Sequence, residues 1–288
     1  MNLRNPKNTI NGGKNRKSVG PSKSWETGKS WETRKTGRPV NSGNIAALDV
    51  DGTLYDGTLG FSVLDELRES GWISEAAVSR VRAAMAEHRG AGTEFRTTLH
   101  RTCSAYGSAV SGVPYEEVVR ASHGAWRRVR HRLLECAAPL VETLRAAGYT
   151  PLLLSGSPQE MVDRIGDELG VEHRTGLAPT IRGGVCTPHL RTVPAVPEVK
   201  AALLRAAAAR LGADPTRSLA IGNSASDREL LRGVGMPIAF EPDPALSCLA
   251  GRHGWPVADR NTVVGLARAV TSMPASRWPV DTAAATAP

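Results

Sequence analysis

Hydrophobic and polar positions follow two periods along the chain, and together they predict alternating strands and helices. Short unbroken apolar runs predict four buried strands, at 44–51, 149–155, 218–222 and 237–240. Apolar residues at helical spacing predict further helices at 161–169, 200–211 and 227–232. Residues 176–197 are rich in Gly, Thr and Pro, so we expect a hairpin or an irregular excursion there. This alternation is typical of an α/β fold in which helices cover both faces of a parallel sheet.

The stretch 59–147 is also mostly helical in pattern, and it is too long for a simple connection between two strands. We therefore expect an inserted helical cap at 59–137. The α/β core would then comprise 44–58 and 138–272, followed by a flexible tail at 273–288.

Polar residues follow three of the predicted strands, at the points where those strands end. Asp49 and Asp51 end the first strand, Ser155 ends the second, and Asn223 and Asp227 follow the third. Ligands of open α/β sheets bind beyond the carboxyl ends of the strands. We therefore expect these loops to converge on one site, although they are far apart in sequence.

Lys200 begins the helix before the third strand, in a position to reach the same cleft. Two carboxylates can divide the labour of nucleophile and proton shuttle, and a lysine with a small hydroxyl can bind anionic oxygens. Further carboxylates nearby need a hard cation such as Mg²⁺, which prefers oxygen ligands. These groups together indicate phosphoryl transfer through an aspartyl-phosphate.

Four segments stand in the order of the four motifs of haloacid dehalogenase-like phosphatases. They are Asp49-Val-Asp-Gly-Thr-Leu54, Ser155-Gly-Ser157, Lys200 and Gly222-Asn-Ser-Ala-Ser-Asp227. With a helical cap between the first two motifs, the chain resembles the branch that includes phosphoserine phosphatase, over about residues 44–260. The resemblance implies a Rossmann-like core and a Mg²⁺-dependent phosphatase acting on a small phosphorylated metabolite, over which the cap closes.

The resemblance also implies a role for each matching position. Asp49 is expected to be the nucleophile, Asp51 the general acid and then the base, and Lys200 the cation that neutralises Asp49 and the phosphoryl group. Ser155 is expected to act with Lys200 in catalysis and phosphate binding. Two further positions, Thr53 and Gly156, are expected to bind phosphate.

The expected ligands of Mg²⁺ are Asp49, Asp51 through its main-chain carbonyl, Asn223 and Asp227. Two residues depart from the family pattern. Asn223 stands where an Asp is usual, so we expect weaker metal binding, and Thr58 stands where phosphoserine phosphatases have a substrate-binding Glu. The alternative is a catalytically weak protein of the same fold that binds or regulates a partner.

Charge divides the chain into two parts. The whole chain carries +8, and all of the excess lies in residues 1–43, while residues 44–288 are neutral. Residues 1–43 lack apolar periodicity and read as a disordered basic tail. Trp25 and Trp31 in that tail could stack on nucleic-acid bases under the alternative reading, but the neutral body argues against a nucleic-acid partner for the rest. Lys200 is the only lysine among residues 44–288, against 25 arginines.

The remaining candidate residues favour simpler readings. No apolar run approaches the ~20 residues of a membrane span, and four scattered cysteines are typical of reduced thiols in a cytoplasmic protein. Cys186 and His189 lack a second pair of zinc ligands. Arg96, Arg101 and Arg127 could point from the cap toward an anionic substrate, although a solvated helix face explains each of them. The oligomeric state stays open.

Overall fold

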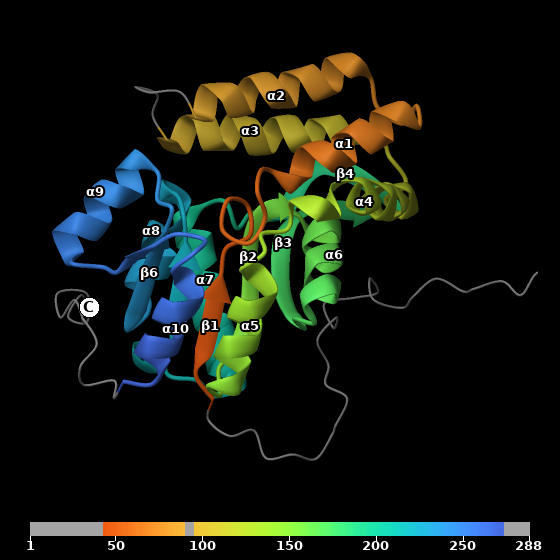
Figure 1. Ribbon diagram of the computed structural model, residues 1–288. Coiled ribbons are helices and arrows are strands. Elements are labelled where there is room, and N and C mark those ends of the chain that lie inside the picture. The colour runs from red at the N-terminus through yellow and green to blue at the C-terminus, as the bar shows by residue number, and fades with distance from the viewer. Residues whose placement is uncertain (1–42, 90–94, 274–288) are drawn as a thin grey trace, which may run out of the picture. The chain divides into compact units, whose positions relative to one another are not determined.

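A seven-stranded sheet runs through the protein (Figure 1). The computed structural model describes residues 43–89 and 95–273. The strand order is β4-β3-β2-β1-β5-β6-β7, and β1 pairs in parallel with both β2 and β5. The strands are β1 (Ile45–Leu48), β2 (Thr150–Pro158), β3 (His173–Arg182), β4 (Val185–Thr192), β5 (Leu219–Gly222), β6 (Met236–Phe240) and β7 (Val257–Ala258). The expected α/β class is confirmed, with the antiparallel β3–β4 pair at one edge.

Helices cover both faces of this sheet, as Figure 1 shows. They are α5 (Ala137–Ala146), α6 (Gln159–Leu169), α7 (Pro197–Leu211), α8 (Arg228–Arg232), α9 (Pro244–His253) and α10 (Val263–Thr271). The period of two in β1 explains the two cores. Ala46 and Leu48 belong to the apolar cluster that includes α5, α6 and α10. Ile45 and Ala47 belong to the cluster that includes α7, α8 and α9. A strand buried on both faces therefore reads as one continuous apolar run.

Four helices precede α5 and lie beyond the carboxyl ends of the strands (Figure 1). They are α1 (Leu59–Glu69), α2 (Glu75–Arg89), α3 (Phe95–Val110) and α4 (Tyr115–Val129). Buried Val118, Ala121 and Ala125 recur along one face of α4, as an amphipathic helix requires. Our division into a cap at 59–137 and a core at 44–58 and 138–272 stays a prediction.

The sequence pattern missed part of the secondary structure. We predicted four strands and the described residues form seven; the ambiguous stretch 176–197 contains the β3–β4 hairpin, and the short β7 was not predicted. The helix expected at 227–232 begins as a 3-10 turn, Ala225–Asp227, before α8. The predicted tails lie outside the described residues, apart from Gly43 and Met273.

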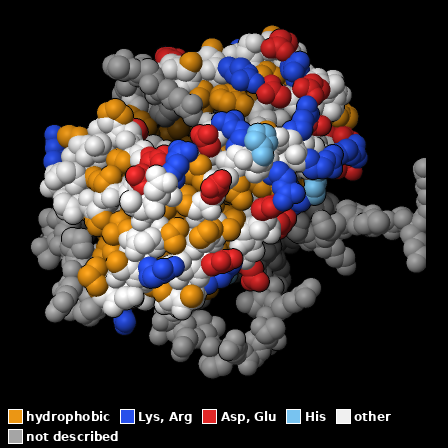
Figure 2. All heavy atoms as spheres, viewed as in Figure 1, with side chains coloured by type: hydrophobic (Ala, Val, Ile, Leu, Met, Phe, Trp, Pro, Cys, Tyr) orange, Lys and Arg blue, Asp and Glu red, His pale blue; other side chains and the backbone are white. Residues whose placement is uncertain are grey.

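Charged side chains of both signs are interspersed on the face shown in Figure 2. Arg82 pairs with Asp65 at 2.7 Å, and Arg130 pairs with Glu168 at 2.5 Å. This intermixing agrees with the zero net charge of residues 44–288. Among the described residues, no helix is both long enough and apolar enough to cross a membrane.

Candidate active site

The ends of β1, β2 and β5 meet at one edge of the sheet. Leu48, the last residue of β1, pairs with Leu153 of β2 on one side and with Ile221 of β5 on the other. Asp49 follows directly, and its backbone N–H donates to the Ile221 carbonyl at 2.9 Å. The convergence expected from three separate segments is therefore what the structure shows.

Lys200 is the centre of this edge. It lies in the first turn of α7 and its side chain is only 1% exposed. Its Nζ donates to Asp49 Oδ1 at 2.6 Å and to Asp227 Oδ1 at 2.6 Å. Burial lowers the pKa of Lys200, but Asp227 and Asp49 outweigh burial and raise the pKa above its ordinary value. The ammonium therefore stays charged between the two carboxylates.

Asp49 is almost fully buried, at 5% exposure. Its second oxygen, Oδ2, accepts from the Thr53 hydroxyl at 3.2 Å, so Thr53 holds the carboxylate in place. Burial and the negative charge of Asp227 raise the pKa of Asp49 to about 7, against the opposing effect of Lys200. A carboxylate whose charged form is this costly to bury favours a nearby positive group.

Asp51 lies on the same loop but is held by different donors. Its Oδ2 accepts from the Ser157 hydroxyl at 2.6 Å, and its Oδ1 accepts from the Leu59 N–H at 3.3 Å. Asp51 is half-buried, unlike Asp49. The two aspartates of the loop therefore occupy the distinct environments that separate roles require.

Ser157 is a residue that the sequence did not assign to Asp51. We considered it only as a support of the phosphate loop or as a helix cap. The available signal was its spacing, because residues two apart on a strand point to the same face. Ser157 also donates its N–H to the Ser155 hydroxyl at 3.1 Å, and Ser155 is fully buried. Gly156 lies between them, and a Cβ there would be 3.0 Å from the Ala195 Cβ.

Asp227 is fully buried and anchors the loop after β5. Its Oδ2 accepts from the N–H groups of Asn223 at 3.0 Å and Ser224 at 3.1 Å, while Oδ1 accepts from Lys200. The Asn223 amide lies against Gly52, where a Cβ would overlap its Nδ2. Asn223 is thus beside the loop that carries Asp49 and Asp51.

The donor set fits a hard divalent cation. Carboxylate, amide and carbonyl oxygens come together from the ends of β1 and β5, and the buried negative charge of Asp49 and Asp227 exceeds that of Lys200 alone. Within 43–89 and 95–273, no group of three or more His, Cys, Asp or Glu side chains could hold a metal ion. The fit therefore depends on the Asn223 amide and the backbone.

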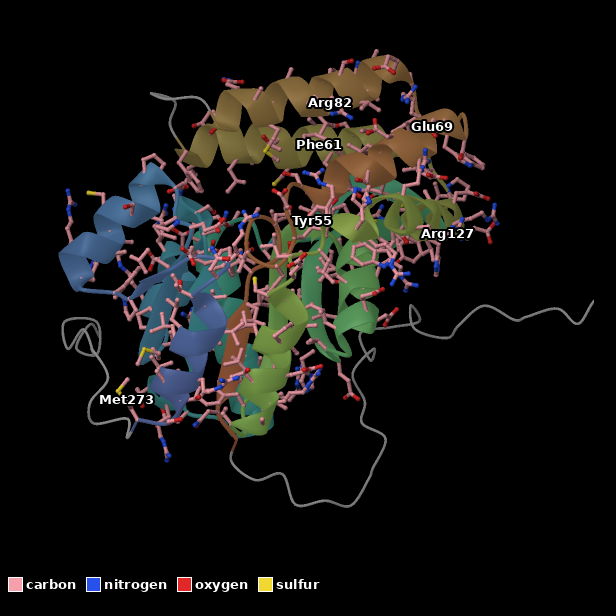
Figure 3. All side chains as sticks on the ribbon, viewed as in Figure 1. Tyr55, Phe61, Glu69, Arg82, Arg127 and Met273 are labelled. Carbon is pink, nitrogen blue, oxygen red and sulfur yellow. The ribbon has the colours of Figure 1, made fainter. Side chains whose placement is uncertain are left out.

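The other candidates are separate from this cluster. Arg101 pairs with Glu87 at 2.5 Å on α2, and Figure 3 shows Arg127 on the outer flank of the molecule. Only Arg96 of the three arginines lines a cavity facing the sheet edge. All four cysteines are free thiols, and buried Cys186 differs in exposure from His189.

The mostly parallel sheet, the inserted helices and the clustered Asp49, Asp227 and Lys200 define a Rossmann-like α/β hydrolase with a helical insertion. The chain belongs to the haloacid dehalogenase-like hydrolase family, whose model matches residues 46–232. The expected family is therefore confirmed, and so is the similarity to the phosphoserine phosphatase branch.

Three comparisons describe that similarity. The chain is 26% identical, over 80% of its length and 60% of the relative's, to a phosphoserine phosphatase of Archaeoglobus fulgidus. It is 34% identical, over 45% of its length and 47% of the relative's, to an inhibition of morphological differentiation protein of Streptomyces azureus. A solved phosphoserine phosphatase, captured as a phospho-aspartyl intermediate analogue, shares the fold with a TM-score of 0.56 and 19% identity, over 76% of this chain and 94% of that one. The chain thus spans less than two thirds of the first two relatives.

Proposed function

We propose that the protein is a Mg²⁺-dependent phosphatase that hydrolyses a small phosphomonoester through an aspartyl-phosphate on Asp49. The observation that carries the proposal is the buried bridge of Lys200 between Asp49 and Asp227, at 2.6 Å on each side. A buried ammonium that faces two carboxylates is an arrangement that binds and neutralises a transferring phosphoryl group. Relatives that carry the name phosphoserine phosphatase support the same class of reaction.

In the first step, an Asp49 carboxylate oxygen attacks phosphorus as the bond from phosphorus to the leaving oxygen breaks. Asp51 gives its proton to that oxygen, and the alcohol leaves. In the second step, water attacks the aspartyl-phosphate while Asp51 takes a proton from it, which releases phosphate and restores Asp49. The hydrogen bond from Ser157 holds Asp51 beside the site for both transfers.

Four residues are proposed to hold the phosphate oxygens. Lys200 supplies the charge, Ser155 and Thr53 supply hydroxyls, and Gly156 allows close approach of the backbone. Thr53 and Lys200 each contact Asp49 already, so both are adjacent to the oxygens that would carry the phosphoryl group. Ser155 acts from the neighbouring strand.

Mg²⁺ would be held by Asp49, the Asp51 carbonyl, Asn223 and Asp227. Once bound, it supplies a positive charge that stabilises the charge of the transferring group. Asp227 is already engaged by Lys200 and two backbone N–H groups, so its contribution to the metal is proposed to run through water.

The proposed partner is a small phosphorylated metabolite. The cap helices lie over the sheet edge that carries the site, and a closed cap excludes large substrates (Figure 1). Free cysteines support a reducing, cytoplasmic location.

Phosphate release from small phosphomonoesters tests this proposal, measured against Mg²⁺ concentration and with a chelator. Asp49→Asn is the test variant and Asp56→Asn is its matched control, because Asp56 is an exposed aspartate of the same loop. We expect turnover to require Mg²⁺, to be lost in Asp49→Asn and to persist in Asp56→Asn. Equal inactivity of all three proteins at millimolar Mg²⁺ contradicts the proposal.

A second candidate function has one observation in its favour, the neutral Asn223 at the metal position. Under this reading the protein binds phosphate but hardly turns it over, and residues 1–43, outside the described structure, bind a partner. Calorimetric binding of inorganic phosphate with no hydrolysis at saturating Mg²⁺ would support this candidate over the enzyme.

A further inference from the structure

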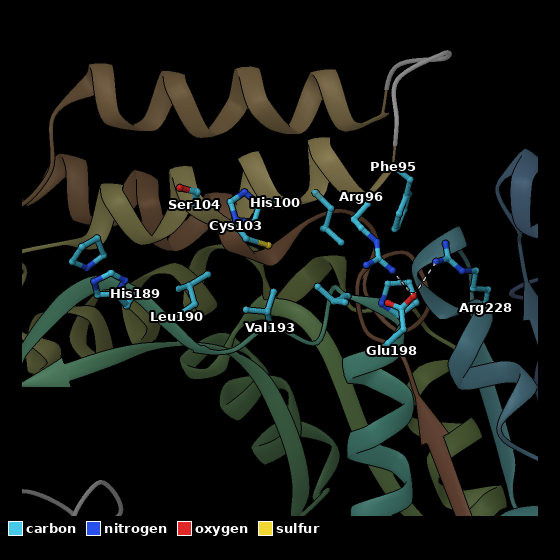
Figure 4. Close-up of a pocket in the computed structure, with 14 residues that line it drawn as sticks. Phe95, Arg96, His100, Cys103, Ser104, His189, Leu190, Val193, Glu198 and Arg228 are labelled. Atoms are coloured by element: carbon cyan, nitrogen blue, oxygen red, sulfur yellow. Dashed lines mark hydrogen bonds and ion pairs between the residues drawn. The ribbon is translucent and has the colours of Figure 1, made fainter. Parts of the chain in front are cut away.

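A cavity of about 450 Å³ lies between α3 and the stretch from the end of β4 to the start of α7 (Figure 4). Its volume falls within the ~300–1,000 Å³ typical of small-molecule sites. Figure 4 shows an elongated slot, with His189 toward one end and Arg96, Glu198 and Arg228 gathered at the other. The slot therefore has a length along which a bound molecule can extend.

Apolar side chains line the slot between those ends. Phe95 and Leu99 contribute from α3, while Leu190, Val193 and Val196 contribute from the opposite wall. Leu99 is among the buried core residues, and Leu190 is half-buried. A wall of this composition binds apolar groups because they leave water there.

The charged end of the slot is internally paired. Glu198 accepts from Arg96 at 3.1 Å and lies 3.5 Å from Arg228. The Arg228 guanidinium also lies over the Phe95 ring, 5.4 Å from its centroid. These charges already satisfy one another, so the slot does not need a charged group of the ligand to balance them.

This charged end adjoins the reacting residues. Glu198 is two residues before Lys200 in α7, and Arg228 follows Asp227 directly. The slot wall that includes Val193 and Val196 also contains Ala195, which lies against Gly156 of the proposed phosphate loop. A phosphoryl group at Asp49 therefore has its leaving group beside the slot.

We propose that the preferred substrate is the phosphate monoester of an alcohol with an apolar body, several carbons long, that fills this slot. This inference rests on the proposed phosphatase function and adds the class of leaving group. Each methylene that enters the slot contributes about 0.8 kcal/mol of transfer free energy, which is about fourfold in kcat/KM.

The test is a rate series with ethyl, butyl and hexyl phosphate, alongside phosphoserine and acetyl phosphate. Acetyl phosphate reports on the reacting residues without a leaving group long enough to fill the slot. We expect kcat/KM to rise about tenfold with each two carbons and hexyl phosphate to exceed phosphoserine. Leu190→Gln should flatten the rise, whereas Leu266→Gln should keep it, because Leu266 is a half-buried leucine of α10 outside the slot.

The outcomes separate the two proposals. Hydrolysis of acetyl phosphate with equal rates across the alkyl series overturns the apolar substrate and leaves the phosphatase standing. A preference for phosphoserine over hexyl phosphate, or a Leu190→Gln series as steep as wild type, does the same. No hydrolysis of any compound overturns the phosphatase, and the substrate inference with it.

Discussion

Glu160 is a buried carboxyl group with a measurable effect on stability. It lies in the first turn of α6, is 3% exposed, and its Oε2 has no hydrogen-bond partner within the described structure. The Tyr106 hydroxyl and the Thr187 hydroxyl are likewise buried and unpartnered there. Burial raises the pKa of Glu160 to about 7, although a hydrogen bond from Tyr115 opposes the rise.

The sign of the effect follows from this shift. The unfolded chain releases the Glu160 proton near the ordinary pKa of 4.5, whereas the folded protein keeps it until about pH 7. Between these values the folded state binds more protons, so the free energy of unfolding falls as pH rises. At 1.36 kcal/mol per pKa unit, the loss by pH 8 is about 3 kcal/mol.

Glu160→Gln removes the ionisation and keeps the shape of the side chain. We expect the variant to be more stable than wild type at pH 8, by up to about 3 kcal/mol, and nearly equal to it at pH 5. For a domain of this size the difference at pH 8 corresponds to a melting temperature higher by about 6–12 °C. Thermal unfolding followed by circular dichroism at both pH values measures it.

Glu172→Gln is the matched control, because Glu172 is an exposed glutamate just beyond α6. It should change the melting temperature little at either pH. The reasoning about Glu160 is refuted if Glu160→Gln shifts the melting temperature equally at pH 5 and pH 8, or lowers it at pH 8.

Three further changes test the site. Gly52→Ala places a Cβ against Asn223 at a backbone φ of +79°, so we expect turnover to fall at least tenfold in a phosphate-release assay. Asn223→Asp adds a carboxylate among the proposed metal ligands and should lower the Mg²⁺ concentration for half-maximal rate. Arg96→Ala breaks an exposed ion pair with Glu198; thermal unfolding should show a cost below about 1 kcal/mol, while KM for a slot-filling substrate rises.

The parts of the fold that the sequence predicted are those with a strong periodic signal. β1 and β5 are buried on both faces, so each appears as an unbroken apolar run. The β3–β4 hairpin lies at a sheet edge and exposes much of β4, and its Thr, Gly and Pro residues resemble those of a loop. Its existence depends on pairing with β2, which a local pattern does not encode.

The site divides in the same way. The convergence of Asp49, Lys200 and Asp227 could be predicted because parallel strands end at one edge of a sheet. The hydrogen bond between Ser157 and Asp51 joins residues 106 apart, and its existence depends on the register of two strands. The burial of Glu160 depends on helices from the insertion, so nothing in its neighbouring sequence marks it.

The single lysine of residues 44–288 is explained by the space and charge around it. An ammonium has three N–H donors, of which two reach Asp49 and Asp227. The third is left for a phosphoryl oxygen, within a space that exposes 1% of the side chain. A guanidinium is larger and planar, so the 25 arginines of the body are no substitute here.

Charge balance then gives the substitution at Asn223 a physical meaning. Asp49 and Asp227 against Lys200 leave the buried cluster with one net negative charge. A bound divalent cation turns this to one net positive charge, whereas an aspartate at 223 would make the same site neutral. The asparagine therefore weakens attraction for the metal and strengthens attraction for a phosphate dianion once the metal is held. Affinity for Mg²⁺ and affinity for substrate should accordingly change in opposite directions when Asn223 is made acidic.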